Sequence, residues 1–301
     1  MIKNLQFSNR PLLVYLLISF SIVWICSGII YFSGIGYDSI GSTLIVAFLC
    51  MPAPALAAYI VQKYIKNEPF QNLEVTYQYA NKTALALNFL WIILFVVFFF
   101  FWVYLGGNIL KWDLMGTVDL SYAGMIDKME EMAAYSVDLS SKNLPQPIVM
   151  IGIVLVLGFI SGCSINLLFT LGEEIGWRGF LFKLWQQLGF HQRVLLTGTI
   201  WGLWHAPLIL LGHNYDNYPI IGTGMMVLFC ISLSYPMDWI RQQSKSVLGP
   251  AIFHGSINAV AALSILFCKD GNELIGSIPG LAGIFAGFSL FGVMFFIKKP
   301  A

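Results

Sequence analysis

Two glutamates and an arginine stand together in an apolar stretch, FTLGEEIGWRGFLF, at residues 169–182. Glu174 and Arg178 are four residues apart with the acid on the N-terminal side, which is the favourable order for a helical ion pair. Glu173 is rotated by about 100° from Glu174 on a helix and lacks a local partner. We therefore expect Glu174 to be a paired, inert carboxylate and Glu173 to be available as a base. The alternative is that both acids only anchor the helix at the membrane surface.

A histidine stands in the middle of a second apolar stretch, TIWGLWHAPLIL, at residues 199–210. Trp201 precedes His205 by four residues, so the two rings share one face of a helix and can pack together. Pro207 removes a backbone donor just after the histidine and loosens the local helix. A lone buried histidine in such a place also fits a purely structural role.

The third polar group lies in LGPAIFHGSINAV, at residues 248–260. His254 and Asn258 are four residues apart and project from one face of a helix. The alternative to a functional pair is a structural hydrogen bond between helices.

Polar side chains at these positions are costly in lipid, by about 2.5–3.5 kcal/mol for an ionised group at the centre of a membrane helix. We therefore expect Glu173, His205, His254 and Asn258 to converge on one buried, water-containing cavity. A carboxylate, two imidazoles and an amide can activate water and stabilise an oxyanion, which indicates hydrolysis within the membrane. Proton relay in a transporter is an alternative use of such groups, but no inverted repeat is visible in the sequence.

The helices that must position these residues are predicted from composition. Of 301 residues, 58% are hydrophobic and 10% charged, against about 25% charged in soluble domains. We predict an all-α fold, a single integral membrane domain over residues 1–301 with about eight transmembrane helices. The net charge of +1 gives no long-range field for nucleic acid. The expected spans lie near residues 11–33, 41–62, 83–105, 147–171, 194–212, 219–237, 247–268 and 275–297.

The span near residues 41–62 contains the sequence CMPAPALAAY. Pro52 and Pro54 each lack a backbone donor and should kink the helix. The alanines between and after them allow other helices to approach closely. We interpret the segment as packing geometry, with the shaping of a cavity as an alternative.

The distribution of lysine and arginine predicts the orientation, because cytoplasmic segments carry an excess of these residues. With both termini in the cytoplasm of a multi-pass cell-membrane protein, the outer segments hold only Lys111, Lys128, Lys142 and Lys269. The longest outer loop, 106–146, is acidic, and its residues 122–135 have the spacing of a short amphipathic helix. The inner segments hold Lys3, Arg10, Lys63, Lys66, Lys82, Lys183, Arg193, Arg241, Lys245, Lys298 and Lys299.

Three motifs in this order resemble the CPBP family of intramembrane proteases, which includes the Abi proteins and the type II CAAX prenyl endopeptidases. EExxxR is Glu173-Glu174-Ile-Gly-Trp-Arg178, the aromatic residue before a histidine is Trp201-Gly-Leu-Trp-His205, and HxxxN is His254-Gly-Ser-Ile-Asn258. The resemblance covers a catalytic core at roughly residues 147–265. The first three helices share only hydrophobicity and the proline–alanine pattern.

The resemblance implies an intramembrane endopeptidase that cleaves a membrane-associated peptide, lipidated or bacteriocin-like. It assigns Glu173 and His205 to water activation and His254 and Asn258 to the oxyanion. Glu174 and Arg178 would hold the local helix geometry, with Trp201 as a supporting aromatic. A non-catalytic bacteriocin-immunity or scaffold protein is the competing function. Substrate, oligomeric state and source stay open.

The family has been described both as metalloproteases and as glutamate-dependent enzymes without metal. A catalytic zinc site needs three protein ligands plus water, and the candidates are Glu173, His205 and His254. The compact HExxH spacing of many zinc proteases is absent. We therefore favour a metal-free carboxylate mechanism, with zinc as the alternative cofactor.

Overall fold

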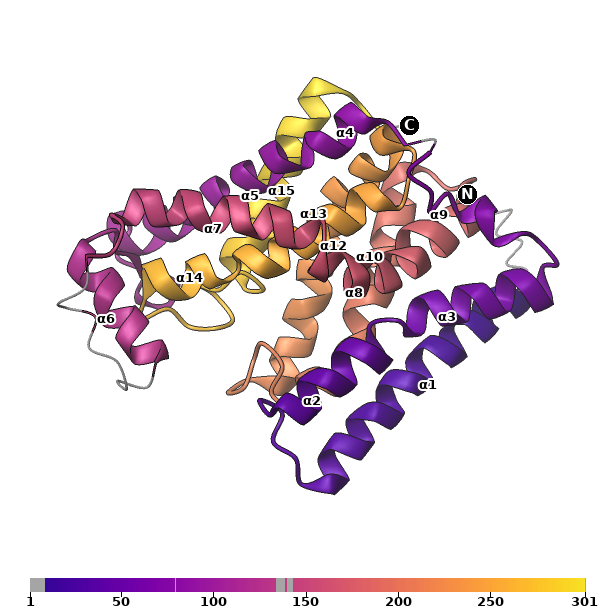
Figure 1. Ribbon diagram of the computed structural model, residues 1–301, viewed down its shortest axis with the longest axis horizontal. Coiled ribbons are helices and arrows are strands. Elements are labelled where there is room, and N and C mark those ends of the chain that lie inside the picture. The colour runs from indigo at the N-terminus through magenta and orange to yellow at the C-terminus, as the bar shows by residue number, and fades with distance from the viewer. Residues whose placement is uncertain (1–8, 79, 134–138, 140–142, 301) are drawn as a thin grey trace.

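The structure is a computed structural model that describes residues 9–78, 80–133, 139 and 143–300. Within these residues the chain is a bundle of helices (Figure 1), which confirms the predicted all-α class. The first half contains α1 (Asn9–Ser33), α2 (Ile40–Ile45), η1 (Val46–Cys50), α3 (Ala53–Ile60), η2 (Val61–Ile65), η3 (Phe70–Leu73), α4 (Lys82–Ala86), α5 (Asn88–Val103), η4 (Tyr104–Ile109), η5 (Asp113–Met115) and α6 (Tyr122–Met132).

The second half carries the three motifs. It contains α7 (Pro147–Gly162), α8 (Ile165–Glu174), η6 (Ile175–Leu181), α9 (Phe182–Leu184), α10 (Phe190–Trp204), α11 (Ala206–Ile209), α12 (Pro219–Ser244), α13 (Leu248–Val260), α14 (Ala262–Phe267) and α15 (Leu281–Ile297). Of the η segments, η3 and η5 are 3₁₀ turns and the others are π-helical. A short antiparallel pair, β1 (Thr117–Val118) with β2 (Cys268–Lys269), joins two loops.

Five of the described helices are long and apolar enough to cross a membrane, which makes this a multi-pass membrane protein. They are Arg10–Ser33, Ile40–Ile65, Lys82–Ile109, Pro219–Ser244 and Leu248–Phe267. A sixth span results if Pro147–Gly162 and Ile165–Leu184 count as one helix, bent by 58°. The predicted number of about eight is not confirmed. The remaining two expected spans form the shorter helices α10, of 15 residues, and α15, of 17 residues.

The expected span at 147–171 is not one continuous helix, because the helix breaks between α7 and α8. Ser164 has φ −133° and ψ −96°, outside the helical region. The break turns α8 toward α13, and two hydrogen bonds hold it there. Asn166 donates to the carbonyl of Gly255 over 2.9 Å, and Thr170 donates to the carbonyl of Ala251 over 2.9 Å.

The predicted irregularity at Pro52 is present, since the helix is interrupted at Met51–Pro52 between η1 and α3. This segment packs directly on the motif helix α8. A Cβ added to Gly172 would lie 2.8 Å from the carbonyl oxygen of Met51 and 2.9 Å from Cα of Pro52. The proline–alanine segment therefore fixes the position of the residue just before Glu173.

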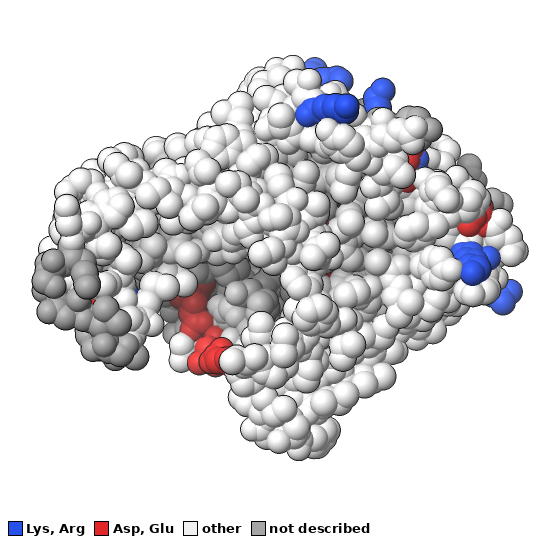
Figure 2. All heavy atoms as spheres, in the orientation of Figure 1, with Lys and Arg blue, Asp and Glu red and all other residues white. Residues whose placement is uncertain are grey.

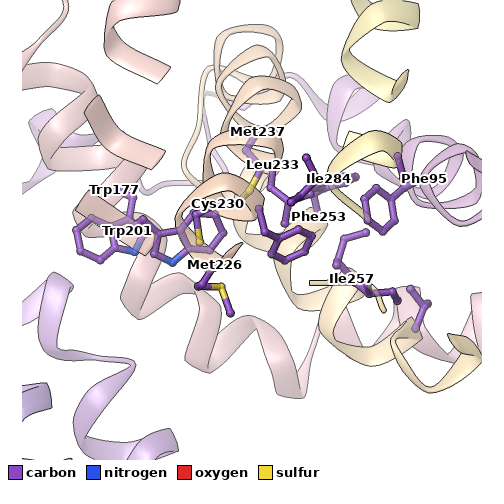
Figure 3. Packing of buried hydrophobic residues seen from close by; sticks show 14 of the residues in the cluster. Phe95, Trp177, Trp201, Met226, Cys230, Leu233, Met237, Phe253, Ile257 and Ile284 are labelled. Carbon is purple, nitrogen blue, oxygen red and sulfur yellow. The ribbon is translucent and has the colours of Figure 1, made fainter. Parts of the chain in front are cut away.

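The core lies where α10, α12, α13 and α15 pack together. Figure 3 shows Trp201 beside Trp177, with Met226 and Cys230 close by and Phe253 further along the same layer. The backbones of α10 and α12 approach closely at Gly198, where an added Cβ would lie 2.6 Å from Cα of Ile231. This packing determines the position of the end of α10, which carries His205.

Two surface features were expected in the loops. The amphipathic helix is present as α6, but Met125 and Ile126 are buried, so the helix packs on the bundle. The predicted end of that helix, residues 134 and 135, lies outside the described residues, as do Lys3 and Lys142. Figure 2 shows lysines and arginines at the upper and right edges of the molecule with some acidic side chains beside them, and further acidic side chains in a hollow at the lower left.

Candidate active site

Glu174 and Arg178 are the most enclosed members of the first motif. Arg178 Nη1 lies 3.1 Å and 3.0 Å from the two carboxylate oxygens of Glu174, and neither side chain is exposed. The predicted ion pair therefore forms, although the helix between the two residues is π-helical. Such π-helical turns occur frequently at functional sites. Arg178 also donates through Nη2 to Ser234 Oγ over 2.7 Å, which connects the pair to α12.

His254 contacts the same carboxylate. Its Nδ1 lies 3.0 Å from Oε1 of Glu174. Because an ionised carboxylate only accepts hydrogen bonds, Nδ1 carries the proton and donates it. Glu174 therefore does more than stabilise its own helix, because it orients an imidazole on α13. The sequence did not indicate this contact, since the two residues are 80 positions apart.

Glu173 faces away from the arginine, as predicted from the helical rotation. Its partner is Trp201 on α10, whose indole Nε1 donates to Oε2 over 2.9 Å. Only 3% of Glu173 is exposed. The same indole ring has Arg178 over its face at 4.6 Å and the His254 ring at 5.2 Å. Trp201 thus contacts Glu173 and Arg178 of the first motif and His254 of the third, beyond the packing on His205 that we expected.

His205 is the C-cap of α10 and is half-buried. Its Nδ1 lies 2.9 Å from the carbonyl oxygen of Trp201. A carbonyl accepts only, so Nδ1 carries the proton and, in the neutral ring, Nε2 is left as the acceptor. The Trp204 ring packs edge-on against the imidazole at 5.0 Å. This arrangement leaves one basic nitrogen of His205 free for a water molecule or a substrate.

One cavity of about 310 Å³ brings the four predicted residues together. Glu173, His205, His254 and Asn258 all line it, whereas Glu174 and Arg178 are not among its lining residues. Asn258 is the most exposed of the four. The rest of the wall is largely apolar and includes Val46, Met51, Trp201, Trp204, Leu208, Met226, Phe229, Cys230, Leu233, Ile257, Ala261 and Ile278.

Sequence reasoning missed two residues at this cavity, His213 and Asn214, which lie in the loop between α11 and α12. The ring of His213 is parallel to that of His205, with an interplanar angle of 5° and 6.1 Å between centroids. Tyr37, from the loop before α2, contacts Nδ1 of His213 over 2.8 Å. The only signal in the sequence was the position of His213, which lies eight residues after His205 and just beyond the end of an apolar run.

The candidate zinc ligands do not form a metal site. In the part of the chain that the structure describes, no group of three His, Cys, Asp or Glu side chains is arranged to hold a metal ion. Nδ1 of His205 and Nδ1 of His254 are used in other hydrogen bonds, so each ring could bind a metal only through Nε2. The three residues share a cavity but their arrangement does not fit zinc.

Comparison with known proteins agrees with this arrangement. Residues 143–260 match the family model described as type II CAAX prenyl endopeptidase Rce1-like. A stretch of 107 residues is 30% identical to a CAAX prenyl protease 2 of Methanococcus maripaludis, and it covers 33% of this chain and 39% of that protein. The matched part is thus less than half of either protein. The matched segment contains all three motifs and also His213, which lines the cavity with them, and this match confirms the resemblance found in the sequence. Residues 143–260 of this chain are thus similar to the Rce1-like type II CAAX prenyl endopeptidases.

Proposed function

We propose that this protein is an intramembrane endopeptidase that uses Glu173 as its general base. The observation that carries the proposal is the shared cavity, in which Glu173, His205, His254 and Asn258 face one enclosed space. Three separate helices supply these groups. Polar groups that meet inside an apolar bundle indicate a function because they are expensive to bury there.

In the proposed reaction, water attacks the carbonyl carbon of the scissile peptide bond and transfers a proton to the carboxylate of Glu173. His205 positions the water through Nε2, the nitrogen that is free of other partners. Trp201 donates to Oε2 of Glu173 and holds the carboxylate in place. The proton then passes from Glu173 to the leaving amine nitrogen as the carbon–nitrogen bond breaks.

We assign the stabilisation of the oxyanion in the tetrahedral intermediate to His254 and Asn258. Asn258 offers an amide N–H, and His254 can donate from Nε2 only when both ring nitrogens are protonated. The carboxylate of Glu174 at Nδ1 stabilises that cationic ring. Arg178 in turn keeps Glu174 ionised and fixed, so the pair positions the imidazole without contacting the substrate.

We infer that this mechanism runs without a metal, because the described residues do not assemble three ligands. The test is to dialyse the purified protein against a chelator and measure its metal content and activity. Full activity without stoichiometric metal is expected. Loss of activity that zinc restores would contradict the inference.

The substrate class is proposed from the name of the relative, a CAAX prenyl protease. The protein should be reconstituted in liposomes with two quenched-fluorescent peptides that end in a CAAX sequence, one farnesylated and one not. Glu173→Gln is expected to abolish cleavage, while Glu131→Gln, on the exposed side of α6, leaves it unchanged. Undiminished cleavage by the folded Glu173→Gln protein would remove the proposed base.

A further inference from the structure

A second cavity, of about 190 Å³, lies between the ends of three helices and apart from the candidate active site. We call it the crevice. Its walls come from α4 and the start of α5, from the last turns of α12 and from the end of α15. The lining residues are Asn81, Thr83, Ala84, Leu87, Trp91, Trp239, Ile240, Gln243, Ile297 and Lys298. None of these ten lines the cavity that contains Glu173.

The crevice lies at the level where membrane helices begin and end. One span begins at Lys82, and α12 ends at Ser244. The backbone N–H of Asn81 donates to the carbonyl of Ser244 over 2.8 Å, which joins these two helix ends. The end of α15, at Ile297, also lines the crevice. Trp91 lies about 13 Å deeper than Lys82, at 1.5 Å of rise per residue. The crevice therefore reaches from the membrane surface into one leaflet, whose apolar part is about 15 Å thick.

The inner part of the crevice is apolar and aromatic. The Trp91 and Trp239 rings meet edge to face, with 5.6 Å between their centroids and an interplanar angle of 84°. Both rings are buried, whereas Leu87 and Ile297 at the rim are 39% and 62% exposed. Because these exposed side chains belong to apolar helices of the bundle, the crevice opens sideways toward lipid. Acyl chains are as apolar as these side chains, so an acyl chain suits the inner part.

The outer part of the crevice is polar, and Lys298 is fixed there. Lys298 leaves α15 in an extended conformation, with φ −157° and ψ 121°. Its carbonyl accepts from Nε1 of Trp239 over 2.8 Å, and its Nζ donates to Oε1 of Gln243 over 2.7 Å. Asn81 and Thr83 complete the outer wall with an amide and a hydroxyl group. An exposed lysine usually keeps its rotamer freedom, but here two hydrogen bonds to α12 hold the ammonium group at the crevice.

The outer part carries positive charge without an acid to balance it. Of the residues that the structure describes, no acidic one lines the crevice. Lys82, Lys245, Lys298 and Lys299 are exposed at the ends of the same helices, and none forms an ion pair with another described residue. Figure 2 shows lysine or arginine side chains at its upper edge, where Figure 1 places α4 and one end of α15. The occupant that complements this site is therefore negatively charged at its outer end.

A phospholipid combines a phosphate with acyl chains at the depth that the crevice spans. We propose that the crevice binds an anionic phospholipid, with its phosphate at Nζ of Lys298 and one acyl chain along Leu87, Trp91 and Ile297. The ammonium group has three donors, so it can contact the phosphate and keep its bond to Gln243. Basic pockets between membrane helices recognise anionic headgroups in this way. The site does not depend on the proposed endopeptidase function.

The headgroup contact is tested by native mass spectrometry of the purified protein in detergent. The probes are phosphatidylglycerol and phosphatidylcholine with the same acyl chains, and we expect the first phosphatidylglycerol to bind more tightly than the first phosphatidylcholine. Lys298→Gln should weaken phosphatidylglycerol binding about fivefold, the contribution of one lysine near an anionic headgroup, and leave phosphatidylcholine binding unchanged. Lys63→Gln is the matched control, because Lys63 is an exposed lysine near the end of the span Ile40–Ile65. Equal affinity for the two lipids, or an equal loss in both variants, would overturn the proposal.

The acyl-chain contact is tested by narrowing the crevice. Leu87→Trp and Ile297→Trp each place a larger side chain in it from opposite walls, and both should lose the tight binding of phosphatidylglycerol. Leu90→Trp is the control, since Leu90 is 42% exposed but does not line the crevice. Phosphatidylglycerol should raise the melting temperature of the wild-type and Leu90→Trp proteins but not of the two narrowed variants. Undiminished binding by either narrowed variant, once thermal unfolding shows that it is folded, would exclude the crevice as the lipid site.

Glycerol 1-phosphate distinguishes a lipid site from a site for free phosphate. It carries the phosphate of phosphatidylglycerol without the acyl chains, so at millimolar concentration it should not displace the bound lipid. Displacement would mean that the lysine binds soluble phosphate and that the apolar part contributes nothing, which contradicts the proposal. None of these measurements uses peptide cleavage, so a failure of the endopeptidase function and a failure of the lipid site give different results.

Discussion

The carboxylate of Glu174 is shared between Arg178, at 3.0 Å, and Nδ1 of His254, at 3.0 Å. One acid thus fixes both the motif helix and the imidazole on α13. The neighbouring acid, Glu173, faces the cavity and is held by Trp201. Two adjacent glutamates consequently have different environments, one paired with Arg178 and His254 and the other beside the cavity.

Breaking this shared pair is expected to destabilise the fold. Glu174→Ala leaves Arg178 buried without its carboxylate, which costs about 3–5 kcal/mol. The double variant Glu174→Gln with Arg178→Met removes both charges and should recover most of the thermal stability but not the peptidase activity, since His254 stays unoriented. Thermal unfolding in detergent measures this, and equal stability of the single and double variants would contradict the buried-charge argument.

Removing the indole donor at Glu173 should affect turnover more than binding. Trp201→Phe keeps a ring beneath Arg178 but loses the 2.9 Å hydrogen bond to the carboxylate. Loss of a hydrogen bond to a charged group costs about 1.5–3 kcal/mol, so kcat should fall about tenfold to a hundredfold with KM little changed. Trp204→Phe is the matched control, because that indole donates to the carbonyl of Ser19 instead. A similar fall in both variants would indicate general loss of packing.

The site was largely predictable because its members are local patterns on helices. Spacing alone separated Glu173 from Glu174, since the i and i+4 positions of Glu174 and Arg178 face each other even through a π-helical stretch. The cost of polar groups in lipid then required the three helices to meet. The contact of His254 with Glu174 and the presence of His213 depend on tertiary packing and loop geometry, which no local pattern encodes.

The number of spans was less predictable than their helical nature. Residues 147–171 form one continuous apolar run in the sequence, but the helix is interrupted at Cys163–Ser164. No charged residue or proline marks this interruption. The helix at 194–212 ends at Trp204, with His205 as its C-cap, and Pro207 lies in the first turn of the separate helix α11. Windows of mean hydropathy average over such breaks, so they give the count of apolar segments and not that of straight spans.

The ion pair between Asp119 and Lys269, at 2.7 Å, should make the attachment of α6 sensitive to acid. The hydrogen bond from Lys269 lowers the pKa of Asp119 to about 2, with help from Ser121. A lowered pKa gives stability that is present above the unfolded value of about 3.9 and is lost as the pH falls toward 2. Limited proteolysis of the α6 loop should therefore speed up between pH 4 and pH 2, and Asp119→Asn should remove that dependence. Unchanged acid sensitivity in Asp119→Asn would assign it to other groups.

The contact of Gly172 with the proline segment is expected to be intolerant of even one methyl group. In Gly172→Ala the new Cβ would lie 2.8 Å from the carbonyl oxygen of Met51, and backbone atoms on both helices must move apart. Overpacking of this kind costs about 1–3 kcal/mol, and the shift displaces Glu173, the next residue, from Trp201. Gly152→Ala on α7 is the matched control, since its Cβ meets nothing within 4 Å. Thermal unfolding and activity together test the contact. If Gly172→Ala behaves like Gly152→Ala in both, the proline segment does not position Glu173, the proposed base.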